Sequence, residues 1–208
     1  MMNAQSESLG DQVSRLQKRV NELRRAGDPG ALLAGARAAA DEIEGRVEEP
    51  WDVSGREAMT VVRRFTFNAA ADCWPGWAAA DKPPDPRNLR LAQELALRSA
   101  RIVEKLRLGA VQEGTGIWLC GAFDLALGQY AEASSAFAVA RARFVTAGTP
   151  GLILLTEGYS AIVRQISGVP TQADSRSLDQ VLSDIDSGGF EDGPEWIAQL
   201  QTALQVFA

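Results

Sequence analysis

A helical periodicity of apolar residues runs through almost the whole chain, from Ser6 to Phe207, and it constrains the fold more than any other feature. Apolar residues recur three and four positions apart, which places them on one face of an α-helix. No stretch carries a strand pattern longer than a few residues. The sequence therefore predicts an all-α fold of about nine helices with short connections, apart from a longer loop at 74–85.

The clearest unit lies between Gly114 and Gly148, where two amphipathic helices are expected to fold back on each other at Gly128. A glycine at this point can adopt the left-handed conformation that ends a helix. Gly121 and Ala133 are small, so we expect them where the two helices approach closely. The second helix carries its apolar residues on one face: Tyr130, Ala133, Phe137, Ala140 and Phe144.

The pattern of this unit resembles the tetratricopeptide repeat, a helix-turn-helix unit of about 34 residues. The resemblance rests on the spacing of Gly121, Gly128, Tyr130, Ala133, Phe137 and Ala140. The chain departs from the repeat at Ile117, where the repeat has a tryptophan, and Trp118 follows one place later. The resemblance implies antiparallel helical hairpins stacked as a short right-handed solenoid, which would serve as a protein-interaction scaffold.

Such a solenoid would occupy one helical domain over 1–208. N-terminal helices are expected over 6–73, hairpins like the repeat over 86–167, and capping helices over 174–208. A cap is needed because the last hairpin of a stack would otherwise expose its apolar face. The final helix, from Pro194, suits that role.

By the same resemblance, the first helix of each hairpin lines a concave groove that binds a peptide or a helix. The expected groove residues are Trp118, Leu119, Ala122, Leu125, Thr156 and Tyr159. One helical position turns Trp118 about 100° away from the core of the hairpin, leaving the core position to Ile117. Two arrangements remain open: Trp118 anchors a partner in the groove, or Trp118 packs under the helix that starts at Pro150 or under the last helix, which would then fill the groove.

Arg64 and Asn68 lie one helical turn apart on a helix expected over 54–73. Some tetratricopeptide domains hold the terminal carboxylate of a peptide with a basic residue and an asparagine at this spacing. The equivalent positions of later helices are Leu119 and Ile153, which do not complete such a clamp. The resemblance still makes Arg64 and Asn68 candidate contacts to a partner.

Two further segments allow two interpretations each. The helix over 6–26 has an apolar seam, which either packs against the domain or makes a homo-oligomer; the seam comprises Leu9, Val13, Leu16, Val20 and Leu23. Trp74 and Trp77 surround a Pro-Gly turn, and they either plug the stack or line a binding surface. With Arg63, these two tryptophans could also form a pocket for a small molecule.

Local signals place several helix starts. Asp28 is expected to cap a helix running to about Val47, because Pro29 follows it in the first turn. Ser54 and Glu57 have the spacing of a capping box. Asp174 or Ser175 is expected to cap the short helix that precedes Gly188.

Composition narrows the function. The chain has no histidine, so the usual Ser-His-Asp and Cys-His systems are absent, and no metal or cofactor is expected. Cys73 and Cys120 lack the paired spacing of a zinc site and are expected to be buried thiols. A net charge of −6 argues against binding to nucleic acid or to an anionic membrane.

No apolar run is long enough to span a membrane, and no secretion signal is evident, so a cytoplasmic location is expected. The sequence therefore favours a non-catalytic protein-interaction module with a protein or peptide partner. The alternatives are a small-molecule sensor or regulatory domain, and a self-associating structural subunit.

Overall fold

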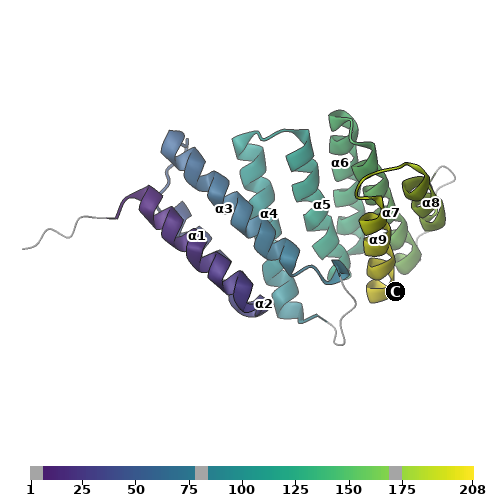
Figure 1. Cartoon of the computed structure of the whole chain (residues 1–208), viewed down its shortest axis with the longest axis horizontal. Helices are drawn as coiled ribbons and strands as arrows, with labels where there is room; N and C mark the ends of the chain where they lie inside the picture. Colours follow the sequence, from purple (N-terminus) through teal and green to yellow (C-terminus); the bar gives the residue numbers. More distant parts are fainter. Residues whose placement is uncertain (1–6, 78–83, 169–174) are drawn as a thin grey trace, which may run out of the picture.

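The protein is described by a computed structural model that covers residues 7–77, 84–168 and 175–208 (Figure 1). Within these ranges the chain forms nine α-helices and one 3₁₀ turn, and no strand, which confirms the predicted all-α class. The elements are α1 (Leu9–Ala26), α2 (Pro29–Glu44), α3 (Val53–Asp72), η1 (Pro75–Trp77), α4 (Pro86–Leu106), α5 (Ala110–Ala126), α6 (Tyr130–Ala147), α7 (Pro150–Ser167), α8 (Leu178–Ser187) and α9 (Gly193–Phe207).

The helices pack in chain order, and each contacts the next from α1 to α9. Helices that are next but one also touch, because α1 contacts α3, α2 contacts α4 and α5 contacts α7. This pattern stacks the helices in two layers, with α1 and α3 in front of α2 and α4 in Figure 1. The last helix, α9, departs from the order and turns back onto α7 and η1.

Side-chain caps fix where several helices begin. Asp28 accepts a hydrogen bond from the backbone N–H of Ala31 at 3.0 Å, as predicted for the start of α2. The cap of α3 is Asp52 and not Ser54, since the Asp52 carboxylate accepts the N–H of Gly55 at 2.7 Å. A carboxylate at this position also interacts favourably with the positive end of the helix dipole.

Two predicted boundaries at other helices also need correction. Helix α2 ends at Glu44, before the expected Val47. Ser177 caps α8 in a capping box with Gln180, and the expected cap Ser175 lies two residues ahead of it. The other candidate cap, Asp174, and most of the loop predicted after Trp77 lie outside the described residues.

The hairpin of α5 and α6 forms where the sequence predicts it. Gly128 has a left-handed backbone, with φ of +73°, at the turn between the two helices. A Cβ atom added to Gly121 would come within 2.9 Å of Ala136 and 3.1 Å of the Phe137 ring. The expected close approach of the two helices is therefore confirmed at Gly121, and Ala133 is a fully buried residue of the same hairpin.

The apolar seam of α1 is used inside the chain. Val13, Leu16 and Val20 are buried, and α1 contacts both α2 and α3. These side chains are consequently not available to pair with a second copy. The seam thus packs the terminal helix against the rest of the chain, which is one of its two interpretations.

Candidate functional site

The residues expected to line an open concave groove lie in the core. Their exposed fractions range from 0% for Leu119 to 7% for Trp118. Ala122, Leu125, Thr156 and Tyr159 are equally inaccessible. The expectation that these side chains face a partner is therefore corrected, because other parts of the chain cover them.

An aromatic cluster fills the space. The Trp74 ring lies edge-on to Phe123, with centroids 5.6 Å apart, and against Phe207 of α9 at 5.2 Å. Trp118 meets Tyr159 edge-on at 5.2 Å. Trp118 is thus more buried than Ile117, which reverses the expected division of roles between these two residues.

Helix α9 closes over the cluster because α7 presents glycines to it. A Cβ atom on Gly158 would come within 2.6 Å of Leu200, and one on Gly151 would overlap the Trp196 ring. The contact also includes a buried polar pair, in which Gln199 Nε2 donates to the Tyr159 hydroxyl at 2.7 Å. Burial raises the pKa of Tyr159 above its usual range, so this hydroxyl stays protonated.

The two tryptophans of the Pro-Gly turn differ in how deeply they are buried. Trp74 is 2% exposed and belongs to the aromatic cluster, whereas Trp77 is 49% exposed. Trp77 Nε1 donates to the backbone carbonyl of Ala71. Since Trp74 is enclosed, the pair does not line an open pocket with Arg63. Trp74 instead packs inside the chain against Phe123 and Phe207, so it does not line a binding surface.

Arg64 and Asn68 differ from the other expected groove residues, because they remain accessible. Both line a recess of about 250 Å³ between α1 and α3. Its apolar floor comes from Val20 and Leu32 together with one face of α3. The full lining is Gln17, Val20, Asn21, Arg24, Leu32, Arg64, Phe65, Asn68 and Ala69, named here the α1–α3 recess.

Among the described residues, the polar groups that line the α1–α3 recess are amides and guanidinium groups, without a carboxylate. Gln17, Asn21 and Asn68 each offer both N–H donors and a carbonyl acceptor. Arg24 donates to Asp72 at 2.7 Å, which ties α1 to α3 beside the recess. A side-chain set of this kind can bind a peptide backbone and its carboxylates.

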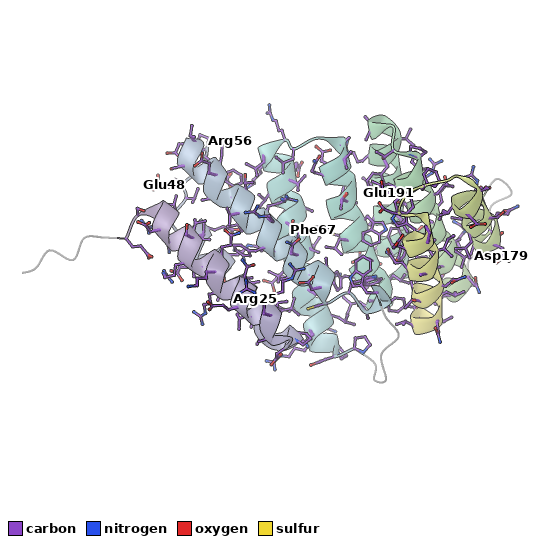
Figure 2. The ribbon with its side chains drawn as sticks, viewed as in Figure 1. Arg25, Glu48, Arg56, Phe67, Asp179 and Glu191 are labelled. Atoms are coloured by element: carbon purple, nitrogen blue, oxygen red, sulfur yellow. The ribbon has the colours of Figure 1, made fainter. Side chains whose placement is uncertain are left out.

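An adjoining recess of about 240 Å³ on α1 shares Gln17 and Asn21 and adds Ser14, Lys18 and Arg25. Its lining also contains no carboxylate. Figure 2 shows Arg25 near the C-terminal end of α1. The two recesses together make a cationic, amide-rich surface on a chain whose net charge is −6.

The sequence-based prediction misses the α1 residues of this surface, although their position relative to the apolar seam could have identified them. Gln17, Asn21 and Arg24 each directly follow an apolar residue of the α1 seam. A residue one position after a seam residue lies beside the buried stripe of a helix. Polar residues repeated at that position therefore line the edge of the contact between α1 and α3.

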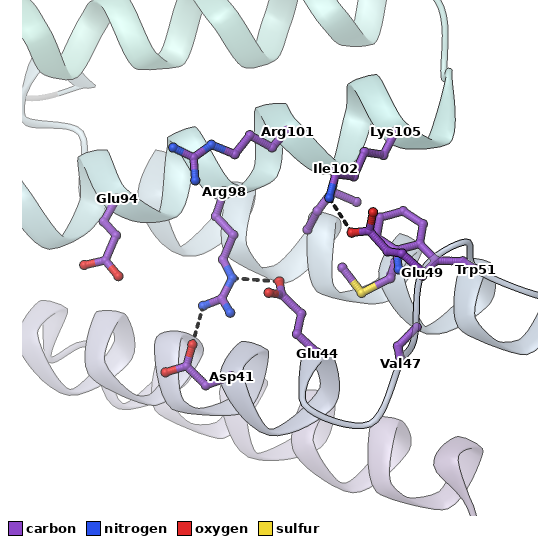
Figure 3. A pocket seen from close by; sticks show the side chains of 11 residues that line it. Asp41, Glu44, Val47, Glu49, Trp51, Glu94, Arg98, Arg101, Ile102 and Lys105 are labelled. Atoms are coloured by element: carbon purple, nitrogen blue, oxygen red, sulfur yellow. Dashed lines mark hydrogen bonds and ion pairs between the residues drawn. The ribbon is translucent and has the colours of Figure 1, made fainter.

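A second charged recess, of about 420 Å³ between α2 and α4, has a different character (Figure 3). Arg98 reaches from α4 to Asp41 at 2.8 Å and to Glu44 at 2.7 Å on α2. Lys105 pairs with Glu49 nearby. Arg98 thus ties α4 to α2, and Lys105 ties α4 to the connection between α2 and α3, so we assign both cations to holding the helices together.

Among the described residues there is no cluster of three or more metal-ligating side chains, and no helix is long and apolar enough to cross a membrane. Burial raises the pKa of Cys73 to about 11 and that of Cys120 to about 12, so both thiols stay protonated near neutral pH. Comparisons with protein families, with curated proteins and with solved structures give no match for this chain.

Proposed function

We propose that this protein is a non-catalytic interaction module, a short stack of hairpins like tetratricopeptide repeats, that binds an extended acidic peptide in the α1–α3 recess. The observation that carries the proposal is the lining of that recess, where, among the described residues, the exposed Arg64 accompanies three amide side chains and no carboxylate, and Arg24 is paired with Asp72 at its edge. The free thiols of Cys73 and Cys120 suit a reducing compartment, so we also propose a cytoplasmic location.

The side chains of the recess would play different roles in binding the peptide. Asn21 and Asn68 would hydrogen-bond the peptide backbone through their amide groups. Arg64 would pair with a carboxylate of the peptide, and a guanidinium group can do so with two parallel hydrogen bonds. Val20 and Phe65 are buried beneath the recess and form its apolar floor. Since the recess is small, a short segment of the partner would provide most of the specific contacts.

An array of synthetic peptides of varied charge, with free or amidated C-termini, tests this proposal on the full chain. Acidic peptides are expected to bind best, and their affinity should fall as salt rises. Arg64→Met and Asn68→Leu should each lower the affinity about tenfold or more, as expected for loss of a charged or bidentate hydrogen bond. Comparison of free and amidated peptides shows whether the terminal carboxylate is the group recognised.

Arg19→Met is the matched control, because Arg19 is exposed on α1 and does not line the recess. It removes the same charge and should leave peptide affinity within about twofold. Equal losses in Arg19→Met and Arg64→Met would show that only overall charge matters. Failure of every peptide to bind, or a preference for basic peptides, would refute the proposal.

A further inference from the structure

A third recess, at the opposite end of the stack, has a lining that the proposed function does not use. It lies between α6, α7 and the residues that lead into α8, and its volume is about 510 Å³. Its lining comprises Ser134, Ala138, Arg141, Glu157, Ser160, Arg164, Ser175 and Arg176, named here the arginine recess. We propose that the arginine recess binds a phosphate monoester, carried either by a small molecule or by a phosphorylated peptide.

A partly buried carboxylate, that of Glu157, orients two of the arginines. Arg141 Nε donates to one oxygen of Glu157 at 2.6 Å, and Arg176 Nη1 donates to the other at 2.7 Å. Only 17% of the Glu157 side chain is exposed, whereas the two arginines are about half exposed, at 48% each. Arg164 Nη2 donates to the backbone carbonyl of Arg176 at 2.8 Å and fixes the third guanidinium group. The cations are thus held in place before any ligand binds.

The charges in this recess do not cancel. Three guanidinium groups face one carboxylate in the lining, Glu157. Asp184, outside the lining, pairs with Arg176 at 3.4 Å. Counting only the described residues, one positive charge remains after both carboxylates are subtracted, in a chain whose net charge is −6. This local excess favours an anionic ligand.

Unused donors point to a phosphate group. Each guanidinium group carries N–H donors on three nitrogens. Among the described residues, the contacts of Arg141 engage its Nε and those of Arg164 engage its Nη2. The remaining nitrogens of both residues, with the hydroxyls of Ser134 and Ser175, can serve several oxygen acceptors at once. A phosphate monoester offers three such oxygens and nearly two negative charges near neutral pH.

Calorimetric titration of the full chain tests the proposal with three ligands: inorganic phosphate, a hexose phosphate and a phosphoserine peptide. Sulfate is the control for inorganic phosphate, and the unphosphorylated hexose and peptide are the controls for the other two. Phosphate-bearing ligands should bind, and their counterparts should bind at least tenfold more weakly. Tighter binding of the hexose phosphate or of the phosphopeptide than of inorganic phosphate identifies the source of the phosphate. Equal affinity for all three would show that the recess recognises the phosphate group alone, which would contradict recognition of a particular monoester.

Arg141→Gln and Arg164→Gln should each weaken binding of the phosphate ligands about tenfold. Arg143→Gln is the matched control, because Arg143 also lies on α6 but pairs with Glu113 at 3.1 Å, away from the recess. It should leave binding unchanged. Circular dichroism checks that each variant is folded. If Arg164→Gln unfolds, Arg141→Gln still tests the proposal, because the Arg141 side chain is about half exposed. Absent binding of all phosphate ligands, or equal weakening by the control variant, would overturn the proposal.

Discussion

At the scale of single residues, the same aromatic side chain can be a binding anchor or a core residue, and burial decides between these roles. Trp118 lies under Tyr159 with 7% of its surface exposed, and Trp77 has 49% exposed. The packing of Trp118 therefore contributes to the stability of the fold. Its substitution should affect the free energy of unfolding, whereas substitution of Trp77 should affect it little.

Trp118→Ala is expected to lower the free energy of unfolding by about 3–5 kcal/mol, the range for removing a large aromatic residue from a core. Trp77→Ala, the matched control, should change it by less than about 1 kcal/mol. Chemical denaturation followed by circular dichroism measures both values. A loss below about 1 kcal/mol for Trp118→Ala would contradict the packing against Tyr159.

Asp124 is the residue at which we expect a pH effect. Burial raises the pKa of its carboxyl above the usual 3.8, and a hydrogen bond from Gln93 at 2.6 Å opposes the rise. Because the folded chain holds this proton more tightly than the unfolded chain, the contribution to stability falls as pH rises through the raised pKa. Asp124→Asn removes this dependence while keeping an oxygen acceptor for Gln93.

The stability of Asp124→Asn relative to the native chain should therefore increase as pH rises from about 3 toward 7. Other carboxyls, such as that of Asp52, titrate in both proteins and largely cancel in the comparison. Denaturation midpoints measured in parallel at several pH values provide the test. A relative stability that is constant or falls with rising pH would show that Asp124 is not destabilised by burial.

At the scale of secondary-structure elements, α9 is the segment that covers the aromatic cluster. It packs on α7, α8 and η1, and its residues reach α7 through the space left by Gly151 and Gly158. Such a contact depends on backbones approaching closely, because any larger side chain on α7 would displace Leu200 or Trp196. The position of α9 is thus sensitive to a single methyl group.

Gly158→Ala should loosen α9, since its new Cβ atom would come within 2.6 Å of Leu200. Overpacking of this kind typically costs about 1–3 kcal/mol. Hydrogen exchange should show reduced protection in α9, with α1 to α4 unchanged. Gly10→Ala is the control, because the nearest atom to its added Cβ lies 3.9 Å away. Unchanged protection of α9 in Gly158→Ala would contradict the contact.

At the scale of the whole molecule, the core is continuous from α1 to α9. In a stack in which each hairpin contacts only its neighbours, the ends can unfold separately. Here α9 and η1 add a contact between the end of α3 and the C-terminal helix. This contact couples segments that are distant in the sequence, and it should make unfolding more cooperative.

We expect a single unfolding transition. In a Trp51→Phe variant, fluorescence would come from Trp74, Trp77, Trp118 and Trp196, all at or beyond the end of α3. Circular dichroism reports on all helices. The two denaturation curves should coincide, as two-state behaviour requires. Curves with different midpoints would show that the N-terminal helices unfold independently.

Much of the helical framework is predictable because the signals are local. The cap at Asp28 and the left-handed Gly128 act within one helical turn, and apolar residues three and four apart define a buried face wherever the helix lies. The sequence alone therefore predicts the all-α class, most of the helices and the α5–α6 hairpin. It misplaces the cap of α3, because Asp52 and Ser54 both qualify and only the folded chain selects one.

The tertiary structure alone decides which surface is left open. An amphipathic helix specifies that one face is covered, but not which segment covers it. Whether Trp118 and Tyr159 meet a partner or α9 depends on contacts of Trp74 with Phe207 and of Gly158 with Leu200, between residues far apart in the chain. In the same way, Asn21 and Asn68 line one recess only because α1 packs on α3. Local periodicity carries no information about such pairings, so the site follows from the packing of the helices.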